Sequence, residues 1–451
     1  MKRREMILSG MVAVSMSGLR RPFGALVRGG ARRALPLPSA QQIAWQDAGM
    51  GMFFHFGVNT FSNREWGDGT EDPKSFNPSA LDARQWIAAA KSANCKYVVL
   101  TAKHHDGFCL WPTKTTDHCV RRSPWRGGQG DVVREVADAA RAAGIGLGLY
   151  LSPWDRNAPS YGSGQGYNDF YIAQLTELLS NYGPLTEVWF DGANGEGPNG
   201  KRQSYDWARI HSTVRRLQPN ALMFSDSGPD IRWIGNERGT AGDPNWCTVD
   251  PSIVTHPGMD GPEIIRSLQN GDEAPRGSVW RPGEADVSIR PGWFHHPAED
   301  VRVKSAATLM EIWHNSVGRN ANLLLNVPPT QTGLIAEPDL KALADFGAAQ
   351  DAFHANAVRG SFAHLPGADA YLTLQFERAE RVNAIAIEED LAKGQRVKAF
   401  HVNAADTVAR GTTIGHRRVL RFEPVTTTGL QLLVEDALDI PAIRNITAYR
   451  A

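Results

Sequence analysis

The sequence predicts an α/β fold: a (β/α)8-like barrel followed by a C-terminal antiparallel β-sandwich. Between residues 41 and 354, short apolar runs rich in β-branched and aromatic residues alternate with segments whose apolar residues recur at helical spacing. The number of these strand and helix units favours an eight-stranded barrel over an open sheet. From residue 355 to 451 the helical segments stop and period-two alternation replaces them, which is typical of an antiparallel sandwich.

The first half of the barrel region contains the clearest elements. Ser79 and Asp131 are candidate N-caps, because their side-chain oxygens can accept from the free N–H groups of a first helical turn. Gly144 predicts the end of the helix that Asp131 begins, since glycine readily adopts the left-handed conformation of a helix C-terminus. The expected strands are 51–57, 95–102, 145–151, 186–191 and 221–225, and the expected helices are 79–93, 131–143, 168–181 and 205–217.

The second half has fewer clear elements. An apolar pair, Val279-Trp280, precedes a helix at about 299–315, a strand at 323–327 and a helix at 338–353. The expected strands of the sandwich are 370–376, 381–387, 397–402, 418–422 and 429–434.

Composition restricts the classes of partner. The 451 residues include 48 Lys and Arg against 48 Asp and Glu, so the formal net charge is zero. A balanced charge gives no electrostatic basis for binding nucleic acid or an acidic membrane surface, and a neutral partner fits better. The four cysteines have no Cys-x-x-Cys spacing, so no zinc site is expected, while one disulfide stays open.

The first 40 residues have the order of an export signal. Lys2, Arg3 and Arg4 precede a mostly apolar run from Met6 to Leu19, which is too short to span a bilayer. Further arginines follow this run, so a basic N-terminal segment is the alternative. The expected location is the periplasm or the extracellular space.

Several expected strands end in residues that can carry chemistry. His55, the pair His104 and His105, Tyr150 and Asp191 all lie where an apolar run ends. Parallel α/β proteins place their active sites at this end of the strands. The two adjacent histidines could be metal ligands, but neighbours on an extended chain point to opposite faces and rarely chelate one ion. Neutral imidazoles would instead suit the hydroxyl groups of a sugar.

Carboxylates indicate the reaction. Asp191 and Trp189 are two residues apart and point to the same face, into the barrel mouth. Glu237 lies in one glycine-containing loop, and Glu284 and Asp286 are expected in another. Glycoside hydrolysis needs two carboxyl groups, one to attack and one to protonate the leaving oxygen. A solvated or capping role is the alternative for any single one of these acids.

The sequence resembles glycoside hydrolase family 29, the retaining α-L-fucosidases. The resemblance covers nearly all of residues 45–350 and rests on the blocks GMFFHFG (51–57), EWG (65–67), KHHDGF (103–108), GLYLSPWD (148–155), VWFDG (188–192) and LLLNVPP (323–329). The loops IRWIGNERG (231–239) and RPGEADVSIRPGWF (281–294) resemble the branch selective for α-1,3/1,4-linked fucose. Residues 355–451 resemble a discoidin-like carbohydrate-binding sandwich.

The resemblance implies roles for individual residues. Asp191 would be the nucleophile and Glu237 the acid/base, with Glu284 a competitor for the second role. The residues implied to hold fucose are His55, Glu65, Trp66, His104 and His105. Tyr150 and Trp189 are the implied wall residues of the pocket. Arg232 and Trp293 are further candidates for the pocket lining.

The expected function is therefore a retaining exo-α-L-fucosidase that acts on terminal, α-1,3/1,4-linked fucose of a glycan, with no metal and no cofactor. Two alternatives stay open: another barrel glycosidase, which the HFG, EWG and KHHDGF motifs disfavour, and a non-catalytic carbohydrate-binding protein, which has no use for two catalytic acids. The sandwich either binds sugar or only packs against the barrel. The sequence leaves the oligomeric state undefined.

Overall fold

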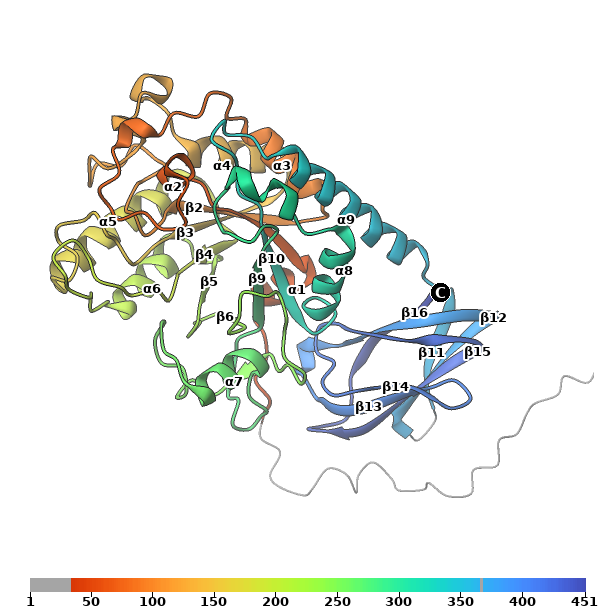
Figure 1. Cartoon of the computed structure of the whole chain (residues 1–451). Coiled ribbons are helices and arrows are strands. Elements are labelled where there is room, and N and C mark those ends of the chain that lie inside the picture. The colour runs from red at the N-terminus through yellow and green to blue at the C-terminus, as the bar shows by residue number, and fades with distance from the viewer. Residues whose placement is uncertain (1–33, 366–367) are drawn as a thin grey trace, which may run out of the picture.

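The computed structural model describes residues 34–365 and 368–451. Eight parallel strands form a closed barrel at the centre of the N-terminal domain, as predicted (Figure 1). In spatial order around the barrel they are β1 (Met50–Phe54), β10 (Ala321–Asn326), β9 (Gly283–Ser288), β6 (Ile231–Trp233), β5 (Leu222–Ser225), β4 (Glu187–Trp189), β3 (Gly146–Leu151) and β2 (Tyr97–Lys103). The barrel strands are buried along almost their whole length, because helices and loops cover the outside and side chains fill the inside.

Helices surround the barrel, and capping residues mark where several of them begin or end. The side chain of Asp131 accepts from the backbone N–H of Arg134, and Gly144 takes the left-handed conformation, so both predicted ends of this helix are confirmed. Ser79 does not cap the helix predicted at 79–93. That helix begins after Asp82, whose side chain is the N-cap. The α-helices are α1 (Ala40–Ala48), α2 (Val58–Ser62), α3 (Ala83–Ser92), α4 (Val132–Ala143), α5 (Gln165–Asn181), α6 (Trp207–Leu217), α7 (Pro262–Asn270), α8 (Ala306–Asn315) and α9 (Glu337–Ala355).

Short elements lie between the main ones. Val279-Trp280 forms a strand, but this strand pairs with another short strand outside the barrel. The helix expected at about 299–315 is divided, because Ser305 caps a new helix after a 3-10 segment. These elements are β7 (Thr248–Val249), β8 (Val279–Trp280), η2 (Pro73–Ser75), η3 (Val120–Arg122), η4 (Trp125–Gly128), η5 (Pro297–Arg302) and η6 (Leu391–Lys393).

Two barrel strands were not expected from the sequence. Strand β6 has only three residues, and β9 carries Glu284 and Asp286 inside the barrel. The prediction that these two acids lie in a loop is therefore wrong. Their burial is tolerated because tryptophan and tyrosine side chains from other strands bond to them.

The C-terminal domain is an antiparallel β domain with its own apolar core, as predicted. The sequence indicated pairs of short strands at 370–387 and 418–434, but each pair is one long, irregular strand. The six strands are β11 (Gly360–Leu365), β12 (Ala368–Glu389), β13 (Val397–Asn403), β14 (Thr407–Gly411), β15 (Arg418–Ala437) and β16 (Ile443–Arg450).

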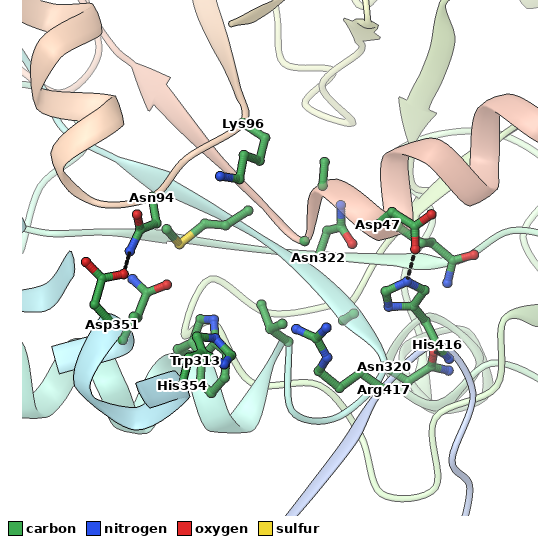
Figure 2. Close-up of a pocket in the computed structure, with 17 residues that line it drawn as sticks. Asp47, Asn94, Lys96, Trp313, Asn320, Asn322, Asp351, His354, His416 and Arg417 are labelled. Carbon is green, nitrogen blue, oxygen red and sulfur yellow. Dashed lines mark hydrogen bonds and ion pairs between the residues drawn. The ribbon is translucent and has the colours of Figure 1, made fainter. Parts of the chain in front are cut away.

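The β domain packs against the end of the barrel where the strands begin. Arg418 donates to Asp243 at 2.6 Å, and the side chain of Gln395 accepts from the backbone of Cys247 at 2.7 Å. A pocket of about 270 Å³ lies at this seam. Figure 2 shows its lining, in which His416 of the β domain bonds to Asp47 at the end of α1.

Two further expectations concern the chain as a whole. All four cysteines lie in the described part, and all are buried and free, so no disulfide forms. Most of the expected export segment, residues 1–33, lies outside the described residues. Among the residues described, no helix is long and apolar enough to cross a membrane.

Candidate active site

A pocket of about 390 Å³ lies at the carboxyl ends of the barrel strands, at the opposite end from the seam with the β domain. The residues that the sequence predicts for the site all line this pocket, with the exceptions of Glu284 and Arg232. The pocket residues come from β1, β3, β4 and β9 and from the segments that follow barrel strands. The barrel therefore brings together groups that are far apart in the sequence.

Asp191 follows strand β4 and has both carboxylate oxygens bonded. Tyr150 donates its hydroxyl hydrogen to Oδ2 at 3.1 Å, and the backbone N–H of Ala193 donates to Oδ1 at 2.7 Å. Nε2 of His105 lies 4.0 Å from Oδ2, and a quarter of the Asp191 side chain remains exposed. The carboxylate is thus oriented and still accessible, which a nucleophile requires.

Glu237 follows strand β6 and lines the same pocket as Asp191. The indole nitrogen of Trp293 donates to its Oε2 at 3.3 Å. Burial raises the pKa of Glu237, and the negative charges of Asp191 and Glu65 raise it further. A carboxyl group that keeps its proton at higher pH is suited to general acid catalysis.

Glu284 does not reach the pocket. It has no exposed surface and lies in the barrel interior, where Tyr97 donates to Oε2 at 2.8 Å and Trp189 donates to Oε1 at 3.0 Å. Burial raises its pKa to about 7, and Glu187 is its carboxyl neighbour. This position contradicts the expectation that Glu284 contacts substrate, and it places the residue behind Trp189 in the pocket wall.

Three histidines form a polar side of the pocket. Burial lowers the pKa of His104 and His105, and it lowers that of His55 to about 3, so the three rings are neutral. Asn326 bonds to Nδ1 of His55 at 2.8 Å and Ser152 to Nδ1 of His105 at 2.7 Å. Neutral rings can both donate to and accept from hydroxyl groups.

His104 and His105 face the same pocket, contrary to the expectation that they point to opposite faces. The rings of His104 and His105 have centroids 4.1 Å apart, and both line the pocket. Strand β2 ends at Lys103, so the two residues lie in a turn and not on an extended chain. Within residues 34–365 and 368–451, no group of three His, Cys, Asp or Glu residues is arranged to hold a metal ion.

Aromatic residues form the rest of the wall. Trp189 stacks on Phe224 with centroids 4.1 Å apart, and Trp66 is 58% exposed at the rim. An exposed tryptophan at a pocket rim offers a flat apolar surface to a sugar ring. Arg232, by contrast, is buried behind the barrel wall, where it donates to Asn245 at 2.7 Å and does not line the pocket.

Three pocket residues were not predicted for the site: Phe53, Ala193 and Asp286. Asp286 lines the pocket, and its Oδ1 accepts from the indole nitrogen of Trp233 at 2.7 Å. The available signal was the alternation Glu284-Ala285-Asp286, which puts both acids on the inner face once the segment is recognised as a strand.

The chain is similar in sequence and in structure to known alpha-L-fucosidases. A family model described as alpha-L-fucosidase matches residues 70–351. Alpha-L-fucosidase 1 of Arabidopsis thaliana is 44% identical over 453 residues, which covers 92% of this chain and 88% of that protein. The crystal structure of a glycoside hydrolase 29 family member from an unknown rumen bacterium is 38% identical with a TM-score of 0.84, covering 93% of this chain and 78% of that one. A GH29 fucosidase of Ruminococcus gnavus in complex with fucose is 29% identical with a TM-score of 0.81, covering 94% and 97% of the two chains.

Proposed function

Because this chain belongs to the alpha-L-fucosidase family, glycoside hydrolase family 29, we propose that it releases terminal α-L-fucose from glycans with retention of anomeric configuration. The observation that carries the proposal is the presence of Asp191 and Glu237 in one pocket. The carboxylate of Asp191 is held by a hydrogen bond and remains partly exposed, and the pKa of Glu237 is raised. Neutral imidazoles and tryptophans around them suit the hydroxyl groups and the methyl group of fucose.

The proposed first step forms a covalent intermediate. A carboxylate oxygen of Asp191 attacks the anomeric carbon of fucose, and the bond from that carbon to the glycosidic oxygen breaks. Glu237 gives its proton to the departing oxygen, so the aglycone leaves as a neutral alcohol.

The second step regenerates the enzyme. Glu237, now ionised, takes a proton from a water molecule whose oxygen attacks the same anomeric carbon. The ester bond to Asp191 breaks and its electron pair returns to the carboxylate. Fucose leaves with the configuration that it had in the substrate, and both acids are back in their starting states.

The linkage preference is part of the same proposal. Support comes from the segments 231–239 and 281–294, whose sequences resemble the branch that prefers α-1,3/1,4-linked fucose. The loop parts of these segments, after β6 and β9, supply Glu237 and Trp293 to the pocket, so they lie where an aglycone would leave. Export to the periplasm or beyond is also proposed, supported by the charged and then apolar order of the first 19 residues.

The test is fucose release from three substrates: an α-1,3/1,4-fucosylated oligosaccharide, an α-1,2-fucosylated one and 4-nitrophenyl α-L-fucoside. Proton NMR of the first sugar formed from the preferred substrate reports the anomeric configuration. Release of the α-anomer from the α-1,3/1,4 substrate supports the whole proposal. Release of the β-anomer would exclude retention, and equal rates on both oligosaccharides would exclude the linkage preference.

A further inference from the structure

The carboxylate of Glu65 joins two loops at the pocket rim. Its Oε2 accepts from the backbone N–H of Trp293 at 2.7 Å, and its Oε1 accepts from the backbone N–H of Phe294 at 3.1 Å. Nε2 of His296 lies 2.6 Å from the same Oε1, and Nδ1 of His296 lies 2.8 Å from Oδ1 of Asn63. We call these five residues the rim clamp, because they connect the loop after α2 to the loop after β9.

His296 completes the clamp with both of its ring nitrogens. Nδ1 bonds to the amide oxygen of Asn63 and Nε2 bonds to the carboxylate of Glu65, and only 16% of the histidine side chain is exposed. The histidine therefore holds the Glu65 carboxylate in the orientation that receives the two backbone N–H groups.

The segment held by the clamp touches the acid/base residue. The indole nitrogen of Trp293 donates to Oε2 of Glu237, and the Trp293 ring lies 5.1 Å from the ring of His55. Asn326 fixes the same segment from below by donating to the carbonyl oxygen of Trp293 at 2.8 Å. Because Oε2 of Glu237 accepts the indole hydrogen, the proton that Glu237 transfers lies on Oε1.

We infer that His296 is a positioning residue for the acid/base step. Through Glu65 it keeps Trp293 in place, and Trp293 directs Oε1 of Glu237 toward the leaving oxygen. The inference rests on the proposed function, because it needs Glu237 to be the acid. It differs from a role in fucose binding, since His296 acts through Glu65 and Trp293 and is absent from the pocket lining.

Two substrates separate positioning of the acid from general damage. α-L-Fucosyl fluoride has a leaving group that needs no proton, whereas an α-1,3/1,4-fucosylated trisaccharide releases a sugar alcohol that does. In His296→Ala, kcat/KM on the trisaccharide should fall by ~10- to 100-fold, because small displacements of a catalytic group have effects of this order. On the fluoride it should fall much less. His296→Gln can still donate to Glu65 and should recover part of the loss.

The β domain offers a matched control. His401→Ala removes another histidine–glutamate pair, in which Nδ1 of His401 lies 2.5 Å from Oε1 of Glu435, and it should leave both kcat/KM values unchanged. Equal losses on the two substrates in folded His296→Ala, or no loss on either, would overturn the inference while leaving the proposed function intact. If the wild-type protein releases fucose from neither substrate, the proposed function and the inference both fail.

Discussion

The hydroxyl group of Tyr150 donates to Oδ2 of Asp191 at 3.1 Å, across the gap between the ends of strands β3 and β4. With the N–H of Ala193 on Oδ1, this bond fixes the plane of the carboxylate. A carboxylate that is already oriented loses little freedom when it attacks, which is a large part of what an enzyme contributes to such a step.

Replacing Asp191 with Asn should lower kcat/KM for fucose release by ~10³-fold or more, because a neutral amide cannot form the ester intermediate. Wild type incubated with a 2-fluoro-fucosyl fluoride should gain one fucosyl unit by mass spectrometry, and the variant should not. Asp345→Asn on the exposed face of α9 is the control. Substantial turnover in the Asp191 variant would remove this residue from the nucleophile role.

Glu237→Gln and Glu284→Gln should behave differently. The first should lose ~10²-fold or more in kcat/KM on an oligosaccharide, since no proton reaches the leaving oxygen, but retain activity on fucosyl fluoride. Added azide should then give fucosyl azide, because azide attacks the intermediate without a general base. Glu284→Gln should retain most oligosaccharide activity, since this side chain is buried behind the pocket. The reverse result would make Glu284 the acid.

Trp293→Phe should move the basic limb of the profile of kcat/KM against pH to higher pH. The indole N–H lowers the pKa of Glu237, so its removal raises that pKa, and a general acid is lost only as pH rises through its pKa. The control is Trp111→Phe, which removes an indole bond to Glu177 outside the pocket. A basic limb that stays in place or moves to lower pH would contradict the assignment.

Glu284 should make the protein more stable in acid. Its pKa in the folded state is raised to about 7, above the value of ~4.3 for an unfolded chain. Its contribution is therefore full below the unfolded pKa and is lost as pH rises toward and through 7. Between pH 5 and pH 8, Tm should fall less in Glu284→Gln than in wild type, while exposed Glu423→Gln should follow wild type. An equal fall in all three proteins would refute this linkage.

The ion pair between Arg418 and Asp243 should stabilise the seam between the domains. The side chain of Arg418 is 5% exposed, so Asp243→Ala leaves a nearly buried guanidinium without its partner. Such a loss should cost about 2 kcal/mol or more in the free energy of unfolding, measured by urea denaturation. Lys341→Ala, which breaks a largely exposed pair, should cost less than ~1 kcal/mol. A similar small effect in both would show that the seam does not depend on this pair.

The sequence predicted correctly those elements whose ends are determined by residues close to them in the chain. The cap at Asp131 and the stop at Gly144 depend on neighbouring residues, and both are found in the structure. Strand β9 was not predicted, because acidic residues such as Glu284 and Asp286 are more typical of loops than of buried strands. Their partners, Tyr97, Trp189 and Trp233, lie on other strands, and nothing near them in the sequence indicates this pairing.

The candidate site was predicted to a greater extent than the strands around it. Polar residues directly after apolar runs, such as His55 and Asp191, do line the pocket. The shared orientation of His104 and His105 depends on a turn after Lys103 that alternation cannot reveal. The rim clamp joins residues more than two hundred positions apart, so no sequence pattern pointed to His296.

The seam between the β domain and the end of the barrel where the strands begin limits how far the protein can be shortened. Asp47, Asp243 and the buried Asn245 bond there to His416, Arg418 and Thr413 of the β domain. A gene cut after α9 would encode a barrel whose polar and apolar groups at that end face water without these partners. Recombinant production of the catalytic part by itself should therefore give aggregated material, and a minimal enzyme has to retain both domains.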